Sequence, residues 1–340
     1  MIYRSKAPLR IGLAGGGTDV SPYSDQFGGA ILNATVSLSA YATLEPLEEN
    51  KIILQALDRE EEQVFNITEE LPVNGTLDLL KGVYNRVQKD YSFPLGGFKL
   101  STFVDAPAGS GLGTSSTLVV AILGAFVERY KLPLGDYDIA HYAYEIERND
   151  LKLAGGKQDQ YAATFGGVNF MEFYEGDKVI VNPLRIKPQY LHELENNLVL
   201  YFTATSRESA TIIKEQVKNV TSNNEKSIEA MHQLKEQAKM MKEALLKGKL
   251  NDIGEILDFG FRQKKLMATN ISNTSIEAIY DAAKAAGATG GKISGAGGGG
   301  FMIFYCPNNT RYAVINALNS FGGDVKKYQF TKYGLTTWTV

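Results

Sequence analysis

The sequence predicts an α+β protein of two domains. Segments with helix and strand patterns follow one another without regular order along the 340 residues, whereas a doubly wound parallel sheet requires strict alternation. The length suits one large or two medium domains, and the composition shifts around residues 183–197. We therefore expect one domain over residues 1–190 and a second over residues 191–340.

The N-terminal half is expected to alternate between extended chain and helix. Strands are expected at residues 2–13, at two or three places within 30–57 and at 100–104, and helices at 76–90, 114–130 and 135–151. The strand at 100–104 should stop before Pro107, because proline cannot continue a sheet ladder. The hydroxyl-rich run 114–116 offers N-cap side chains to the apolar helix that follows it.

The C-terminal half is expected to contain longer helices. Strands are expected at residues 198–203 and 301–305, and helices at 206–217, 227–246 and 274–287. In the helix at 227–246, apolar side chains recur at three- and four-residue steps and should face a core. The helix at 274–287 has a capping box from Thr274 to Glu277 and a glycine stop at Gly287.

The glycines are more informative than the elements. There are 34 glycines among 340 residues, above the usual share of about 7%, and the excess gathers at residues 15–17, 109–113 and 290–300. Packed cores gain little from glycine, whereas loops that bring backbone N–H groups close to a ligand need it. The three clusters therefore mark candidate binding loops.

The middle cluster has the surroundings of a phosphate site. A strand precedes the glycine loop (residues 107–116), and a helix follows it. This order points free N–H groups and the positive end of a helix dipole at one place, which suits a phosphate group. An ordinary glycine-containing turn remains the alternative.

The third cluster imitates a different motif. Residues 295–300 satisfy the spacing G-x-G-x-x-G, but a dinucleotide fingerprint follows a strand and opens a helix. Here the expected helix comes first and the strand second. Neither Lys157 nor Lys292 completes a Walker A sequence. A nicotinamide-dependent dehydrogenase is thus the remote alternative, and a nucleoside triphosphate would need another phosphate loop.

Composition excludes several classes of function. The formal net charge of −3 gives no global positive field for a nucleic acid or an anionic membrane. Cys306 is the only cysteine, which excludes an internal disulfide and suits a reducing compartment. The apolar run 118–127 is half of the roughly 20 residues that a membrane helix needs. We expect a cytoplasmic protein with no nucleic-acid or membrane partner, and the oligomeric state stays open.

Hydrolase motifs are missing from the sequence. It contains no G-x-S-x-G elbow, and His192-Glu193 does not continue into a zinc-binding H-E-x-x-H motif. Asp159 is a better catalytic candidate, because it follows the glycine pair 155–156 and has Glu147 twelve residues before it. Both carboxylates could converge on a phosphate site, or could be solvated at a helix end.

Arg10 is a charge inside an apolar strand. It stands between Leu9 and Ile11. A charge in such a position either faces solvent or is paired within a site. The sequence alone leaves both interpretations open.

Three segments, taken together, carry a resemblance. The segments APLRIGLAGGGTD (7–19), PAGSGLGTSST (107–117) and GGKISGAGGGGFMI (290–303), in this order and at these separations, resemble the three motifs of the GHMP small-molecule kinases. That family includes galactokinase, homoserine kinase, mevalonate kinase and phosphomevalonate kinase. The resemblance covers nearly the whole chain.

The resemblance implies a fold and a set of site residues. It implies an N-terminal domain like ribosomal protein S5 domain 2, a ferredoxin-like C-terminal domain, and ATP with Mg²⁺ in the cleft. The ATP-binding residues would be Pro107, Gly109, Ser110, Gly111, Leu112, Gly113, Thr114, Ser115 and Ser116. Ser115 and Glu147 would hold Mg²⁺, Asp159 would accept the proton of the acceptor hydroxyl, and Arg10 would orient Asp159.

The same resemblance implies a sugar substrate. Candidate substrate residues are Thr18, Asp19, Gly156, Lys157, Arg207, Gly295 and Gly297. Galactokinases carry Gly-Glu-His-Thr-Asp where this chain has Gly-Gly-Gly-Thr-Asp at 15–19. This form is similar to the D-glycero-D-manno-heptose 7-phosphate kinases and to the kinase half of L-fucokinases, which phosphorylate an anomeric hydroxyl.

The length of the chain favours a heptose phosphate substrate over fucose. Arg207, at the expected start of a helix, is the first candidate for binding the phosphate that such a sugar already carries. A fucokinase-like or galactokinase-like sugar 1-kinase is the alternative. A non-catalytic homologue that senses sugar and ATP is a further alternative, although the presence of Arg10, Glu147 and Asp159 together argues against it.

Overall fold

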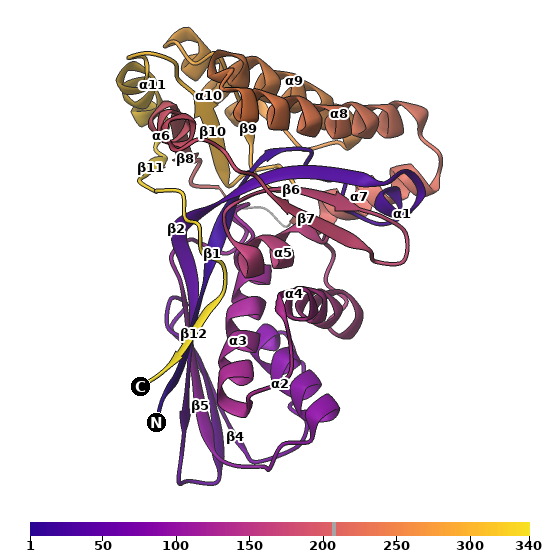
Figure 1. The fold of residues 1–340 in the computed structure, drawn as a ribbon, viewed down its shortest axis with the longest axis vertical. Helices are drawn as coiled ribbons and strands as arrows, with labels where there is room; N and C mark the ends of the chain where they lie inside the picture. Colours follow the sequence, from indigo (N-terminus) through magenta and orange to yellow (C-terminus); the bar gives the residue numbers. More distant parts are fainter. Residues whose placement is uncertain (206–208) are drawn as a thin grey trace.

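The chain forms two β-sheets with helices packed against them. The computed structural model describes residues 1–205 and 209–340, and within these residues it contains an eight-stranded sheet and a four-stranded sheet. The larger sheet extends along one end of the molecule, and the smaller sheet lies at the other end beneath a layer of long helices (Figure 1). The α+β prediction is confirmed.

The larger sheet is mostly antiparallel. Its strand order is β12-β1-β2-β5-β3-β4, and β6 and β7 continue from β2 on a branch; only the β3–β5 pair is parallel among the described strands. Its strands are β1 (Tyr3–Ala14), β2 (Gly29–Pro46), β3 (Lys51–Ala56), β4 (Glu61–Asn66), β5 (Phe98–Val104), β6 (Val168–Phe173), β7 (Val179–Pro183) and β12 (Thr336–Thr339). Strands β1 and β2 are long, and one end of each extends towards the smaller sheet (Figure 1).

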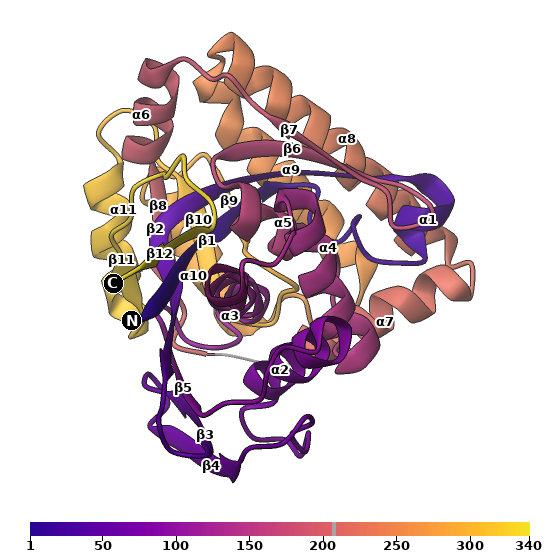
Figure 2. The same cartoon turned by 60° about the horizontal axis from the view of Figure 1, so that its bottom comes forward.

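A group of helices packs on the larger sheet. These are α2 (Asp78–Tyr91), α3 (Thr114–Tyr130), α4 (Asp136–Glu145), a π-helical turn η1 (Ile146–Asp150) and α5 (Gln158–Phe165); the short α1 (Tyr23–Phe27) follows β1. Helix α3 is apolar on nearly all sides and lies among the others (Figure 2). A helix of this kind must be buried, and its residues 119–126 form the centre of the core.

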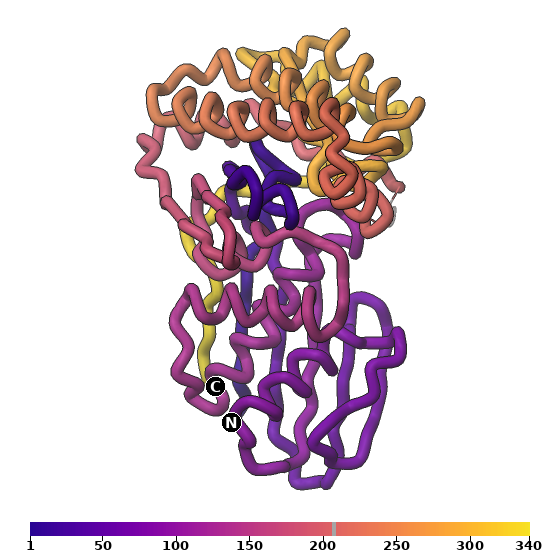
Figure 3. The backbone as a smooth tube through the Cα atoms, turned by 90° about the vertical axis from the view of Figure 1, so that its right-hand side faces the viewer, coloured from indigo at the N-terminus to yellow at the C-terminus, as the bar shows by residue number. Residues whose placement is uncertain are grey.

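The smaller sheet has the order β11-β8-β10-β9 and is antiparallel. Its strands are β8 (Leu198–Phe202), β9 (Gly290–Ile293), β10 (Phe301–Tyr305) and β11 (Asp324–Lys326). Around it lie α6 (Pro188–Asn197), α7 (Ser209–Thr221), α8 (Glu225–Lys247), η2 (Leu250–Asp252), α9 (Ile253–Met267), α10 (Thr274–Ala285), α11 (Arg311–Leu318) and η3 (Asn319–Phe321). The long helices α8 and α9 form an outer layer (Figure 3).

Most expected elements are present within a few residues, with two errors in the helix caps. Helix α3 begins at Thr114, within the run 114–116 that was expected to cap it; its N-cap is Gly113 in a left-handed conformation, and no hydroxyl caps it. Helix α10 is capped by the side chain of Asn273, which accepts a hydrogen bond from the N–H of Ile276, and not by Thr274. The apolar stripe of α8 is buried in the core as expected.

The last strand returns to the first sheet. Residues 336–339 pair with residues 3–6 of β1, after the chain has completed the smaller sheet. A segment from the C-terminal half thus belongs to the N-terminal sheet, and a domain division near residue 190 stays a prediction. No helix within the described residues is both long and apolar enough to cross a membrane.

Candidate active site

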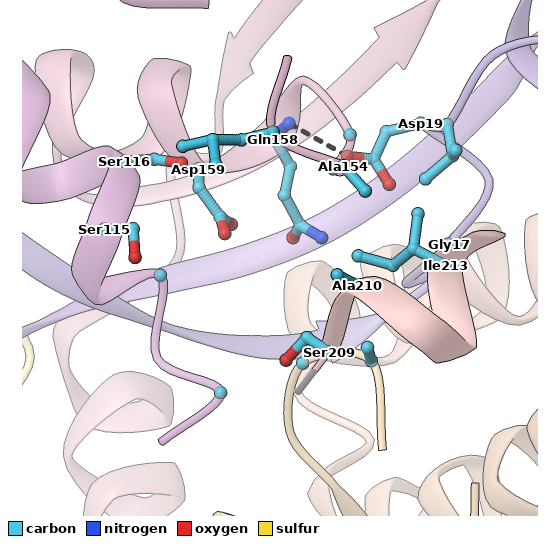
Figure 4. A pocket seen from close by; sticks show the side chains of 18 of the residues that line it. Gly17, Asp19, Ser115, Ser116, Ala154, Gln158, Asp159, Ser209, Ala210 and Ile213 are labelled. Atoms are coloured by element: carbon cyan, nitrogen blue, oxygen red, sulfur yellow. Dashed lines mark hydrogen bonds between the residues drawn. The ribbon is translucent and has the colours of Figure 1, made fainter. Parts of the chain in front are cut away.

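A cavity of about 270 Å³ lies between the two groups of elements, near the lower end of the range for ligand pockets of roughly 300–1,000 Å³. The glycine loop, the segment after β1 and the start of α5 form one side of it, and α7 and α9 form the other. Predicted site residues that line it are Arg10, Asp19, Gly109, Gly111, Gly113, Thr114, Ser115, Ser116, Glu147, Gly156, Asp159 and Gly295. Sequence positions from 10 to 295 thus converge on one place, and Figure 4 shows Asp19, Ser115, Ser116 and Asp159 among them.

The glycine loop presents bare backbone to this cavity. Gly109, Gly111 and Gly113 have φ values of +72°, +84° and +79°, which side-chain-bearing residues rarely adopt. The loop ends directly in the first turn of α3, whose N-terminal N–H groups are free of side-chain caps. A helix N-terminus of this kind attracts a phosphate group.

The third glycine cluster packs against the loop. A Cβ on Gly111 would lie 2.5 Å from the carbonyl oxygen of Ser294, and a Cβ on Gly295 would lie 2.7 Å from Cα of Gly111. The hydroxyl of Ser294 donates to the Gly111 carbonyl at 2.8 Å. Glycine at both positions therefore lets two backbones meet, and the loop from the smaller sheet braces the glycine loop.

Arg10 and Asp159 form an ion pair beside the glycine loop. Nε of Arg10 donates to Oδ1 of Asp159 at 2.7 Å, and Nη1 donates to the carbonyl of Gly111 at 2.5 Å. The arginine side chain is 3% exposed and the aspartate 22%, so the pair is held in protein while the carboxylate still reaches the cavity. A Cβ on Gly113 would lie 3.2 Å from Oδ2 of Asp159, which places the second carboxylate oxygen against the loop.

Asp19 fixes the helix that carries Asp159. Its Oδ2 accepts hydrogen bonds from the backbone N–H groups of Lys157 at 2.8 Å and Gln158 at 3.0 Å, at the start of α5. Figure 4 shows the bond from Gln158. A Cβ on Gly156 would lie 1.9 Å from this oxygen, so the approach requires glycine. Burial raises the pKa of Asp19, against the effect of these backbone donors.

Glu147 offers a buried carboxylate behind the loop. It lies on η1 and accepts a hydrogen bond from Nε2 of Gln160, while the same amide also donates to Oγ of Ser116 at 3.2 Å. Burial raises the pKa of Glu147, and the neighbouring Arg148 opposes this shift. A desolvated carboxylate next to serine hydroxyls is a donor set that suits a hard divalent cation.

The donor set also indicates how such a cation would be held. Within the described residues, no group of three or more histidine, cysteine or carboxylate side chains could hold a metal ion alone. Mg²⁺ commonly binds through one or two protein oxygens together with substrate phosphates. Ser115 and Glu147 fit that arrangement, since both line the cavity beside the glycine loop.

Several predicted ligands have other partners. The Lys157 amine pairs with Asp177 at 2.7 Å and Asp25 at 3.4 Å. The Thr18 hydroxyl donates to the carbonyl of Gly15 in its own turn and to the carbonyl of Ala30 on β2. Among the described residues, the cavity wall does not include Thr18, Pro107, Ser110, Leu112, Lys157 or Gly297. Direct contact of Thr18 and Lys157 with substrate therefore stays a prediction. Arg207 lies outside the described residues.

Sequence reasoning missed the opposite wall of the cavity. This wall contains Ser209, Ala210, Ile213 and Gln216 of α7, Lys264 of α9 and Ala296. In Figure 4, Ser209, Ala210 and Ile213 face Gln158 and Asp19 across the cavity. One signal in the sequence could have indicated this wall. Lys264 lies three residues after Phe261 and three before Met267, so it is a charged residue on the buried face of an amphipathic helix.

Comparison with known families agrees with the site. The family described as GHMP kinases N terminal domain matches residues 78–167. The family described as GHMP kinases C terminal matches residues 241–324. Together these two segments include the glycine loop, Glu147, Asp159 and the wall residue Lys264.

Individual relatives match between 87% and 99% of the chain. It is 48% identical over 337 residues to a D-glycero-alpha-D-manno-heptose 7-phosphate kinase of Campylobacter jejuni, covering 99% of both chains. It is 27% identical to an L-fucokinase/L-fucose-1-P guanylyltransferase of Bacteroides fragilis, over 87% of this chain and 34% of the relative. The crystal structure of a D-glycero-D-manno-heptose 1-phosphate kinase from Bacteriodes thetaiotaomicron matches with a TM-score of 0.85 and 46% identity, covering 99% of each chain.

Proposed function

The chain belongs to the GHMP kinase family, and from this premise we propose that it transfers the γ-phosphoryl group of ATP to the anomeric hydroxyl of D-glycero-D-manno-heptose 7-phosphate, giving the 1,7-bisphosphate. The observation that carries the proposal is the Arg10–Asp159 pair beside the glycine loop. A protein that only senses sugar and ATP has no need of a carboxylate base held by a cation at the phosphate site. The whole-length relative with 48% identity supports the heptose phosphate.

In the proposed reaction, Asp159 accepts the proton of the anomeric hydroxyl as that oxygen attacks the γ-phosphorus. The bond from the γ-phosphorus to the bridging oxygen breaks, and ADP leaves. Arg10 keeps the carboxylate oriented and offsets the negative charge that spreads over the transferring group. The glycine loop and the first turn of α3 hold the phosphates through backbone N–H groups. Mg²⁺ held by Ser115 and Glu147 would supply further charge neutralisation.

The remaining residues are proposed to shape the sugar site. Asp19 and Gly156 would face sugar hydroxyls, and Gly295 would close the cavity from the side of the smaller sheet. Thr18, Lys157 and Gly297 would support the surrounding loops. We propose domains over residues 1–190 and 191–340 with the active site between them, and a cytoplasmic location, where ATP is at hand.

An ADP-release assay with a panel of sugars tests the function. The panel contains heptose 7-phosphate, heptose 1-phosphate, unphosphorylated heptose, L-fucose and galactose, and phosphorus NMR maps the position of each new phosphate. Heptose 7-phosphate and heptose 1-phosphate are both included because one nearly full-length relative is named a heptose 7-phosphate kinase and the other a heptose 1-phosphate kinase. We expect the highest kcat/KM with heptose 7-phosphate and a new phosphate at C1. Efficient turnover of fucose or galactose would favour the alternative sugar 1-kinases, and no turnover of any sugar would favour a sensor.

Ser115→Ala is expected to raise the Mg²⁺ concentration for half-maximal activity by roughly tenfold, because one oxygen ligand is lost. Activity at saturating Mg²⁺ should largely recover. The measurement is a Mg²⁺ titration of ADP release at fixed ATP. Ser320→Ala, whose hydroxyl bonds only the Ala317 carbonyl on the surface, serves as the control. An unchanged Mg²⁺ requirement in the Ser115 variant would remove this residue from the metal site.

A further inference from the structure

Two lysine amines are buried beside the cavity without a carboxylate partner. Lys264 of α9 is 2% exposed and Lys292 of β9 is 4% exposed. Their Nζ atoms donate to the backbone carbonyls of Gly16 at 3.2 Å and Gly12 at 2.8 Å. Among the described residues, no carboxylate lies within 4.0 Å of either amine, the distance that defines the ion pairs. Burying a cation without a counter-charge is costly, so these amines need an explanation.

The surrounding charges leave an excess of cations. Arg10 is a further buried cation that acts on both lysines, but Asp159 already pairs with it. Asp19 is the carboxylate whose charge acts on Lys264, and its Oδ2 is committed to the start of α5. Burial, the largest cause, lowers the pKa of Lys264 to about 8; Arg10 lowers it further, while Asp19 opposes the shift. Burial also lowers the pKa of Lys292. An anion bound here would remove this imbalance.

The segment after β1 leaves room beside the amines. A Cβ on Gly16 would lie 3.7 Å from Nζ of Lys264 and 4.0 Å from Nζ of Lys292, which is ordinary van der Waals contact. Gly15 and Gly17 have positive φ values, but Gly16 does not. Glycine at position 16 therefore keeps both amines free of a neighbouring side chain, although the backbone does not require it.

Gln216 supplies a second unused donor on the same wall. Its Nε2 is buried and has no hydrogen-bond partner in the described structure, and the residue is 2% exposed. Both Gln216 and Lys264 line the cavity. A buried amide without a partner is costly, and a ligand oxygen would satisfy it. An ammonium group and an amide N–H group facing one cavity form a binding site for an oxyanion.

We propose that Lys264 and Gln216 bind the phosphate group that the sugar substrate already carries, with Lys292 as a supporting charge below them. This inference rests on the proposed function, because it assigns a binding site to the 7-phosphate group of the same substrate, at the end opposite the reacting hydroxyl. The triphosphate of ATP has its own site on the glycine loop. Lys264 instead contacts the segment after β1, on the wall formed by α7 and α9. The acceptor hydroxyl at Asp159 and the distal phosphate then occupy different walls of one cavity.

Lys264→Met tests the assignment. Removing the charge should raise KM for heptose 7-phosphate by roughly 10- to 150-fold, the range for a charge-assisted contact, while KM for ATP and kcat/KM for unphosphorylated heptose stay near the parent values. Lys265→Met on the same helix is the matched control, since its amine pairs with Glu277 away from the cavity. Thermal melting verifies that both variants fold.

If Lys264→Met lowered kcat/KM by the same factor with heptose 7-phosphate and with unphosphorylated heptose, the proposal would be overturned, because Lys264 would then act on a group that both sugars have. A phosphate-specific loss in Arg207→Ala and none in Lys264→Met would also overturn it. Calorimetry of heptose 7-phosphate binding separates this question from the proposed function. If the parent protein binds the sugar phosphate but releases no ADP, the function fails, and weaker binding by Lys264→Met than by Lys265→Met still supports the phosphate site. Equal binding by the two variants refutes it.

Discussion

Asp159→Asn is expected to lower kcat by roughly 10²–10⁴-fold, the usual contribution of a positioned general base, with ATP affinity near that of the parent enzyme. The asparagine oxygen can still accept the hydrogen bond from Nε of Arg10, so the local geometry should survive while the proton acceptor is lost. Steady-state kinetics with heptose 7-phosphate and calorimetry with an ATP analogue measure the two effects separately.

The matched control for this variant is Asp150→Asn, which removes a carboxylate from a surface pair with Arg86. We expect it to keep parent kinetics. If Asp159→Asn retained most of its turnover, Asp159 would be removed from proton transfer, and Arg10 with Mg²⁺ would have to account for the catalysis.

Gly111→Val is expected to weaken ATP binding by roughly 100-fold or more and to lower the melting temperature. The φ value of +84° disfavours a β-branched residue. The new Cβ would also lie 2.5 Å from the carbonyl oxygen of Ser294. The structure directs this side chain at the bracing loop and not into the cavity, so binding should be lost because the glycine loop moves.

Gly176→Val separates backbone strain from this clash. Gly176 has a similar φ of +68° but has open space around its Cβ position. Its variant should lose some stability and keep ATP affinity in a calorimetric titration. ATP affinity unchanged in Gly111→Val would contradict the assignment of the glycine loop to the nucleotide phosphates.

The side of the cavity that contains the glycine loop could be predicted, because local sequence signals and spaced motifs coincide there. Strand β5, the glycine loop and helix α3 follow each other directly in the chain, so turn chemistry and apolar content sufficed to place them. For Arg10, the residues left two interpretations open, and the pair with Asp159 across 149 positions decides between them. Spatial pairing of this kind is not encoded in a local pattern.

The remainder depends on long-range contacts. The prediction missed the short strands β4, β6 and β7, whose pairing partners decide their conformation. It expected a helix at 206–217, where α7 lies, but it named none of the described residues of the wall formed by α7 and α9 as site residues. Lys264 becomes a site residue only once α9 packs across the cavity. The cap errors at Gly113 and Asn273 arose because adjacent residues can all serve as caps, and the backbone conformation selects one.

The pairing of β12 with β1 joins segments that the ribosome makes far apart in time. Ile2 and Val340 exchange both backbone hydrogen bonds, at 2.7 and 2.9 Å, so the edge of β1 stays open on the ribosome until residues 336–340 emerge. During synthesis the nascent chain therefore carries an unpaired strand edge, a feature that favours aggregation. The other strands of this sheet, β1 to β7, lie within residues 3–183, so they are synthesised well before the strand that covers the edge of β1.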